Sequence, residues 1–182
     1  MDLPFLDKPN VMFDLETLGT RPGCVVTSIG AVKFGFSKGI TDRFKVNISV
    51  EDCVKNHGMK IDKKTLDWWM TQPKEARDGW MHDPEPIDLK DAVDLFVDWI
   101  GFDKSRFIWS HGASFDQPIL SELFYATGVD KPWHYRQEMD SRTVFNMVGF
   151  VNSESRAKSD LVHHDSVADA EAQALSLIKL FE

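Results

Sequence analysis

A short apolar segment near the start of the chain carries two acidic residues, and it limits how the chain can fold. Residues 11–17, Val-Met-Phe-Asp-Leu-Glu-Thr, have the apolar character of a buried central strand. Asp14 and Glu16 therefore need a cationic partner, because burying an unpaired ionised carboxylate is unfavourable. Side chains two positions apart leave a strand on the same face, so both carboxylates can face one pair of cations. Their oxygens suit Mg²⁺ or Mn²⁺, although a strand end whose acids simply reach solvent has the same pattern.

The remaining segments predict a mixed sheet flanked by helices, an α/β fold. Residues 25–36 and 40–50 are rich in β-branched and aromatic side chains, and with the first strand they predict an antiparallel meander. A buried strand is expected at 106–110 and a short edge strand around Trp133 and Tyr135. Apolar periodicity and turn residues predict helices at 65–77, 89–100, from about 114, and at 165–181, with loops at 79–88 and 152–160.

Length and composition limit the number of domains, the partners and the compartment. Residues 1–182 are enough for a single domain with a substantial core. The formal net charge of −8 argues against a basic nucleic-acid-binding face, but it is compatible with a small phosphate site where bound metal ions supply positive charge. No apolar run is as long as a membrane span, and the first residues lack signal-peptide features, so we expect no membrane partner and a cytoplasmic location.

Three further segments place metal-ligating or acid–base side chains at the ends of predicted elements. Residues 111–116 (His-Gly-Ala-Ser-Phe-Asp) follow a buried strand, residues 140–143 (Asp-Ser-Arg-Thr) follow the expected edge strand, and residues 163–169 (His-His-Asp-Ser-Val-Ala-Asp) enter the last helix. Each has an ordinary explanation when taken alone. Asp116 suits a helix dipole, Asp140 and Arg142 can form a surface ion pair, and a histidine before a helix is usually solvated or a cap.

In this order the segments resemble the three motifs of the DEDDh family, the DnaQ-like 3′-to-5′ exonucleases, whose fold is ribonuclease H-like. The matching parts are Asp14-Leu15-Glu16-Thr17, the Gly-x-x-Phe-Asp ending at Asp116, and His164-x-x-x-x-Asp169 before an alanine-rich helix. Residues 65–72 (Thr-Leu-Asp-Trp-Trp-Met-Thr-Gln) and 140–143 are similar to the DexA-like branch of phage exonucleases and bacterial exoribonucleases. That branch has Asn where this chain has His111, a departure that concerns the backbone near Asp116 and leaves the carboxylates unchanged.

The resemblance implies a catalytic site with two divalent metal ions, Mg²⁺ or Mn²⁺. The implied metal ligands are Asp14, Glu16, Asp116 and Asp169, and the implied general base is His164. His164 has the five-residue offset to Asp169 that the family shows, whereas its neighbour His163 does not. The chemistry is consistent with this assignment, because two metals can stabilise both oxygens of a phosphodiester displacement while an imidazole takes the proton of water.

Residues that contact the substrate are expected around these acids: Thr17, Leu18, Trp69, His111 and Arg142. By resemblance, Thr17 and Leu18 would touch the terminal nucleotide, although simple packing is the alternative for both and explains Leu18 about equally well. Either Trp68 or Trp69 could stack on a base, although Trp69 also fits the buried stripe of its helix. Asp140 is expected to orient the Arg142 side chain without contacting the substrate itself. Arg156 and Lys158 could contact phosphates, or they could simply be solvated surface residues.

We therefore expect a metal-dependent exonuclease that releases nucleoside 5′-monophosphates from 3′ ends of single-stranded DNA or RNA; the polarity and products follow from the resemblance. Two alternatives remain. A non-catalytic nucleic-acid-binding or polymerase-associated module would not need all four acids and His164, and a ribonuclease H-type endonuclease would not need His164 at this offset. The sequence leaves open the choice of DNA or RNA and whether the chain forms a homodimer.

Overall fold

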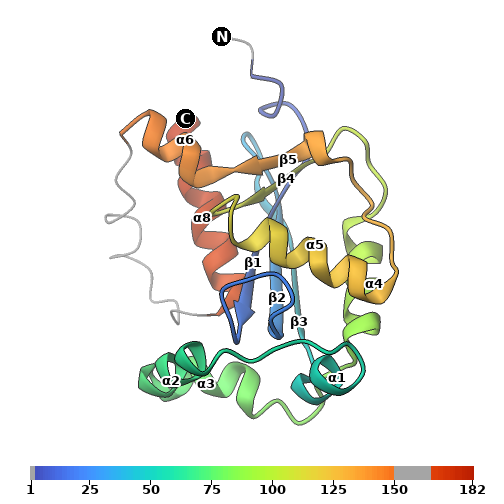
Figure 1. The fold of residues 1–182 in the computed structure, drawn as a ribbon. Helices are drawn as coiled ribbons and strands as arrows, with labels where there is room; N and C mark the ends of the chain where they lie inside the picture. Colours follow the sequence, from blue (N-terminus) through green and yellow to red (C-terminus); the bar gives the residue numbers. More distant parts are fainter. Residues whose placement is uncertain (1–2, 150–164) are drawn as a thin grey trace.

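A computed structural model describes residues 3–149 and 165–182, and its centre is a five-stranded mixed sheet (Figure 1). The sheet order is β3-β2-β1-β4-β5. The first three strands are antiparallel, and β4 and β5 continue the sheet parallel to β1. The strands are β1 (Asn10–Thr17), β2 (Val26–Gly35), β3 (Gly39–Asn47), β4 (Phe107–Ser110) and β5 (Glu138–Asp140). The predicted antiparallel meander followed by parallel strands is confirmed.

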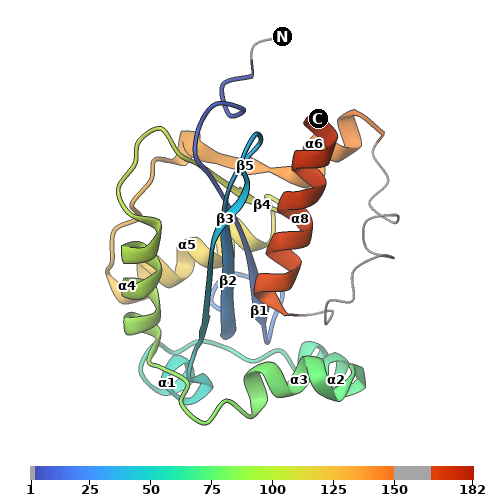
Figure 2. The same cartoon turned by 180° about the vertical axis from the view of Figure 1, so that it is seen from behind.

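Helices cover both faces of this sheet (Figures 1 and 2). On one face α8 (Ser166–Phe181) packs across β1, β2 and β3. On the other face lie α4 (Leu89–Ile100), with its apolar stripe buried as predicted, and α5 (Asp116–Thr127). No helix among residues 3–149 and 165–182 has the length and apolarity needed to cross a membrane.

Alternation along β1 determines which face receives the two acids. Val11, Phe13 and Leu15 belong to the hydrophobic cluster beneath α4 and α5, whereas Met12 belongs to the cluster beneath α8. Because side chains alternate along a strand, Asp14 and Glu16 continue the Met12 series and lie on the α8 face. The predicted common face of the two carboxylates is therefore the face that the last helix covers.

Three short helices lie beyond the end of the sheet where β1 terminates: α1 (Val50–Lys55), α2 (Lys63–Thr71) and α3 (Lys74–Met81) (Figure 1). The single helix predicted at 65–77 is wrong, because Pro73 divides it. The residue before a proline disfavours helical backbone, and Gln72 is extended with ψ 159°. Asp62 caps α2 by accepting hydrogen bonds from the Lys64 and Thr65 backbone N–H groups. The predicted loop at 79–88 begins later, since α3 continues to Met81.

The other differences also occur at short elements. The strand predicted at 40–50 ends at Asn47, and α1 follows with Ser49 as its cap. Trp133 is buried against α4 and α5 rather than in a strand, and Tyr135 begins the 3₁₀ helix η1 (Tyr135–Gln137) just before β5. The helix α6 (Ser141–Met147) was not predicted, and the predicted loop at 152–160 lies outside the described residues.

Candidate active site

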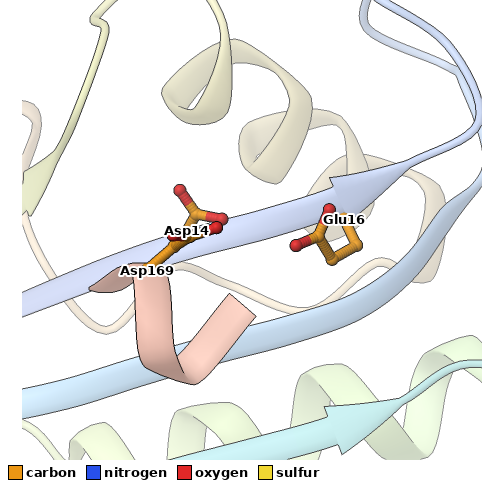
Figure 3. A group of neighbouring side chains, drawn as sticks. All are labelled: Asp14, Glu16 and Asp169. Carbon is orange, nitrogen blue, oxygen red and sulfur yellow. The ribbon is translucent and has the colours of Figure 1, made fainter. Parts of the chain in front are cut away.

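Three of the four predicted metal-ligating acids meet between β1 and α8. One carboxylate oxygen from each of Asp14, Glu16 and Asp169 lies within 4.8 Å of those of the other two. Figure 3 shows the Asp14 and Asp169 carboxylates side by side, with the Glu16 carboxylate turned toward them from further along the strand. The structure therefore gathers residues 155 positions apart in the sequence into one acidic group, as two-cation chemistry requires.

Gly30 allows α8 to approach these acids. It is the cross-strand partner of Asp14 on β2, so any side chain at position 30 would lie beside the Asp14 carboxylate. A Cβ atom there would come within 2.1 Å of the carbonyl carbon of Ser166 and 2.2 Å of the backbone nitrogen of Val167. The first turn of α8, which carries Asp169, thus packs directly against the backbone of Gly30, which has no side chain to prevent the contact.

Polar contacts fix the start of α8 in this position. The Ser28 and Ser166 hydroxyl oxygens are 2.7 Å apart. Asp165 caps the helix, its Oδ1 accepting the Val167 backbone N–H at 3.2 Å, and its other oxygen pairs with Lys45 of β3. The helix start is therefore held by both β2 and β3.

Asp116, the fourth predicted acid, comes from the first turn of α5 and is 4% exposed. The backbone N–H of Leu15 donates a hydrogen bond to its carboxylate, which joins α5 to β1 between Asp14 and Glu16. Asp116 lies outside the tight group of three acids, but its charge is the largest single side-chain contribution to the raised pKa of Asp14. It therefore belongs to the same electrostatic site.

The electrostatics of the site disfavour four ionised acids without a cation. Burial raises the pKa of Asp14 well above 3.8, with the charges of Asp116, Glu16 and Asp169 adding to the rise. Burial, followed by the charges of Asp169 and Asp165, raises the pKa of Glu16 to about 8 against the opposing charge of Lys45. Burial likewise raises the pKa of Asp116 to about 7. The acids need compensating positive charge to be ionised together near neutral pH.

The hydrogen bonds of the acids fit a metal centre. Glu16 Oε1 is buried and has no hydrogen-bond partner among the described residues. Gln173, one turn after Asp169, donates from Nε2 to Asp14 Oδ1 at 2.9 Å. This hydrogen bond fixes the orientation of the Asp14 carboxylate. A buried carboxylate oxygen without a donor is unfavourable unless a cation meets it. The donor set is all oxygen, which suits Mg²⁺ or Mn²⁺.

A cleft of about 530 Å³, the acidic cleft, opens over these carboxylates. Of the predicted substrate-contacting residues, Thr17, Trp69, His111 and Arg142 line it. Leu18 does not fit its prediction, because it is 2% exposed and packs in the hydrophobic core. Trp69 is 1% exposed and uses Nε1 to hold the Thr17 carbonyl at 2.9 Å, so its ring is not available for stacking. The neighbouring Trp68 lines the cleft and is 44% exposed.

Arg142 lies on the opposite wall of the acidic cleft, against Gly112. Its Nη2 donates to the His111 carbonyl at 2.9 Å, and a Cβ atom at Gly112 would lie 3.4 Å from the guanidinium carbon. Gly112 has φ +136°, a conformation that L side chains rarely adopt. His111, which departs from the pattern of the DexA-like branch, places Nδ1 2.9 Å from the Ser141 hydroxyl and so ties β4 to α6.

Asp140 holds the beginning of α6 rather than the Arg142 guanidinium. It accepts the Arg142 backbone N–H at 3.1 Å and the Thr143 hydroxyl at 2.6 Å. Its effect on Arg142 is therefore through the backbone. The predicted general base His164 and its neighbour His163, together with Arg156 and Lys158, lie outside the described residues.

Gly30 and Gln173 were not among the predicted site residues, although a feature of the sequence indicates each of them. A glycine inside a strand often marks close approach of another backbone, as Gly30 does. Residues four apart on a helix share a face, so Gln173 had to lie beside Asp169.

Comparisons with known proteins agree with this geometry. A family model described as the 3′-5′ exoribonuclease Rv2179c-like domain matches residues 9–180. An exodeoxyribonuclease of Enterobacteria phage T4 is 28% identical over 123 residues, which are 62% of this chain and 54% of the phage protein. The chain thus spans about half the length of this curated relative.

Solved structures share the fold at low sequence identity. E. coli exonuclease I in its zinc-bound complex with single-stranded DNA has a TM-score of 0.68 and 16% identity, covering 96% of this chain and 41% of that one. The nuclease domain of 3′hExo, a DEDDh family member bound to rAMP, has a TM-score of 0.63 and 10% identity, covering 96% and 92%. The ribonuclease H-like architecture predicted from the sequence is confirmed.

Proposed function

Because this chain belongs to the family of Rv2179c-like 3′-5′ exoribonuclease domains, we propose that it hydrolyses single-stranded nucleic acid from the 3′ end to nucleoside 5′-monophosphates. The observation that carries the proposal is the acidic group of Asp14, Glu16 and Asp169, which lines an open cleft and includes a buried carboxylate oxygen that no donor among the described residues reaches. A structural cluster of acids would be expected to satisfy that oxygen.

In this proposal two divalent ions, Mg²⁺ or Mn²⁺, are held by Asp14, Glu16, Asp116 and Asp169. When bound, the ions supply the positive charge that polarises the scissile phosphate and stabilises the charge developing on its oxygens. Gln173 keeps Asp14 oriented toward the ions by its 2.9 Å hydrogen bond. Gly30 and the Ser28–Ser166 contact keep Asp169 beside Asp14.

The chain's other residues would bind the substrate and move the proton. Arg142, fixed by the His111 carbonyl, presents its guanidinium to a phosphate at the wall of the cleft. The Trp69 indole holds the Thr17 carbonyl, which keeps the end of β1 rigid where the terminal nucleotide would lie. His164 is proposed as the base that takes the proton of the attacking water, a role typically worth about 10²–10⁴ in rate.

An end-labelled oligonucleotide assay tests this function. With a 5′ label, Mg²⁺ or Mn²⁺ should produce a ladder that shortens from the 3′ end, EDTA should stop it, and a circular single strand of the same sequence should stay intact. Cleavage of the circle would instead indicate an endonuclease. Binding without hydrolysis in either metal would indicate a non-catalytic module. Matched DNA and RNA strands in the same assay identify the preferred sugar.

A further inference from the structure

A second cleft continues from the acidic cleft. Its volume is about 280 Å³, and it shares Gly19 and Thr20 with the acidic cleft. It lies between residues 19–24, which follow β1, and residues 60–62, which precede α2. The two clefts therefore adjoin at Gly19 and Thr20, and together they extend from the carboxylates to the start of α2; we call them the path.

The walls of the second cleft are held together by backbone hydrogen bonds. The Lys60 N–H donates to the Gly23 carbonyl at 2.9 Å, and the Val25 N–H donates to the Lys60 carbonyl at 2.9 Å. The Asp62 N–H donates to the Leu18 carbonyl at 2.7 Å. A surface fixed in this way can bind an extended ligand with little loss of conformational entropy on binding.

The path carries positive charge in an otherwise acidic protein. Arg21, Lys60 and Lys64 are exposed along it, and we call these three residues the basic ledge. Within residues 3–149 and 165–182 none of the three forms an ion pair, whereas the adjacent Lys63 pairs with Asp67 at 2.6 Å. Asp62 also lines the second cleft, but the three cations outnumber it, and cations without an ion pair beside a cleft for a scissile phosphate suit further phosphates of the same strand.

An exposed aromatic ring adds a second kind of contact. Trp68 lies one turn after Lys64 on α2, so the two side chains share a face of the helix, and both line the acidic cleft. A base can stack on an exposed indole while the neighbouring phosphate meets a cation, and such stacking is tolerant of sequence. Arg142 is on the opposite wall, near Asp116, which suits it to the scissile phosphate instead.

We propose that the nucleotides upstream of the scissile bond leave the acidic cleft over the basic ledge, with their phosphates on Arg21, Lys60 and Lys64 and a base on Trp68. The ligand is single-stranded nucleic acid, so this inference rests on the proposed function and specifies its substrate as strands longer than a dinucleotide. The ledge is used only when the strand is long enough to reach it.

The test compares hydrolysis of oligonucleotides from two to twelve nucleotides long. In the wild-type protein kcat/KM should rise with length. The triple variant Arg21→Gln, Lys60→Gln, Lys64→Gln should remove this rise, lowering kcat/KM for a 12-mer on the order of ten-fold through KM, with a much smaller effect on dinucleotide hydrolysis. The salt dependence of 12-mer binding should become shallower by about 2 in its log–log slope, since each contact to a single strand contributes about 0.7.

A matched variant controls for net charge. Lys55→Gln, Lys90→Gln, Lys104→Gln removes the same three charges from exposed sites on other elements, and it should preserve the length dependence. The proposal would be overturned if both triple variants lost the same amount of kcat/KM, or if the ledge variant lost as much kcat/KM on the dinucleotide as on the 12-mer. Trp68→Ala should weaken 12-mer binding several-fold, and Trp68→Phe should restore most of it.

A failure of the proposed function can be told apart from a failure of the ledge. If the wild-type protein hydrolyses no oligonucleotide, the exonuclease proposal is wrong, and fluorescence anisotropy of a labelled 12-mer still tests the ledge. Binding lost in the ledge variant but kept in the control would support the surface. Equal binding by both variants, or no binding by the wild-type protein, would refute it.

Discussion

Two acidic side chains, Asp52 and Glu16, have the same exposed fraction, yet their pKa values shift in opposite directions. Both are 7% exposed. Burial acts to raise the pKa of each, yet the pKa of Asp52 lies below 3.8 and that of Glu16 rises to about 8. The exposed fraction alone therefore does not distinguish a structural carboxylate from a functional one; the depth of the carboxylate within the protein and the partners provided by the fold do.

Asp52 has a complete set of partners. Its Oδ2 accepts the Leu89 backbone N–H at 2.8 Å, and its Oδ1 accepts the Asn56 amide at 2.6 Å. The His57 ring nitrogen lies 3.5 Å away, and the other ring nitrogen contacts the Ala126 carbonyl. This network joins α1 to α4 and α5, and its donors outweigh burial in setting the pKa of Asp52.

Glu16 is surrounded by acids instead. One of its oxygens has no hydrogen-bond donor within the described part of the chain, and Asp169 and Asp165 add negative charge. Lys45 is the side chain whose charge opposes the rise in pKa. Strongly perturbed acids of this kind cluster at functional sites, and in the proposed function the partner of Glu16 is a divalent cation.

The largest expected effect comes from neutralising Glu16. Glu16→Gln keeps the shape of the side chain but removes a proposed metal ligand. The kcat/KM for hydrolysis at a 3′ end should therefore fall about a thousand-fold, the size of effect seen when an enzyme loses one group that stabilises the charge of the transition state. Asp52→Asn is the matched control, a neutralised acid with the same exposed fraction, and should keep nearly full activity. The contrast fails if Asp52→Asn, while folded by circular dichroism, is equally inactive.

The next effect is the pH dependence of stability in the metal-free protein. Glu16 has a pKa of about 8 when folded and an ordinary value of 4.5, so between these values the folded chain holds a proton that the unfolded chain has lost. Stability should therefore fall as pH rises from 4.5 to 8, by a few kcal/mol at about 1.4 kcal/mol per pKa unit. Thermal unfolding in EDTA at pH 5 and 8.5 measures it.

Two controls sharpen this measurement. In Glu16→Gln the decline of the thermal midpoint with pH should be smaller, and Mg²⁺ or Mn²⁺ should raise the wild-type midpoint more at pH 8.5 than at pH 5, because protons compete with metal for the acids. A midpoint that rises with pH in EDTA, with the same slope in both proteins, would contradict the assigned pKa of Glu16.

A third prediction concerns the contact that brings Asp169 to the acidic group. Gly30→Ala places a Cβ atom 2.1 Å from the Ser166 backbone, which cannot move as a flexible side chain would. We expect destabilisation of about 3 kcal/mol, the upper end for an overpacked site, together with loss of activity as α8 shifts. Urea unfolding measures the change.

Gly35→Ala on the same strand is the control, because the nearest atom to its Cβ would be the Lys38 side chain at 3.5 Å. This variant should unfold near the wild-type midpoint. Equal stability of the two alanine variants would show that the start of α8 is not tied to Gly30.

The sequence predicted what depends on local pattern. The apolar run of β1 and the stripe of α4 are local features, and they predicted a central strand and a helix in the right places. The shared face of Asp14 and Glu16 followed from strand geometry alone. The match of three motifs in order then indicated which distant acids would join them.

The parts that were not predicted depend on tertiary contacts. β5 is three residues long and exists because it pairs with β4, so no periodicity could reveal it. The apolar stripe of α2 already indicated that Trp69 could be buried, but no local pattern showed that Leu18, next to the site, also packs in the core. The pairing of Gly30 with the first turn of α8 joins residues 136 positions apart in the chain.

The smallest expected effect is that of replacing Asp52, a residue that stabilises the fold. Asp52→Ala leaves the Leu89 backbone N–H buried without its acceptor, which should reduce the free energy of unfolding by about 2 kcal/mol at pH 7. Glu51→Ala, an exposed neighbour on α1 that pairs with Lys55, should hardly change the midpoint. Because the folded pKa of Asp52 is depressed, its contribution is present above 3.8 and is lost as pH falls below that value, the opposite sign to Glu16. The difference in the free energy of unfolding between the wild-type protein and Asp52→Ala should thus become smaller in acid. A difference that becomes larger in acid would mean that the pKa of Asp52, like that of Glu16, is raised by folding.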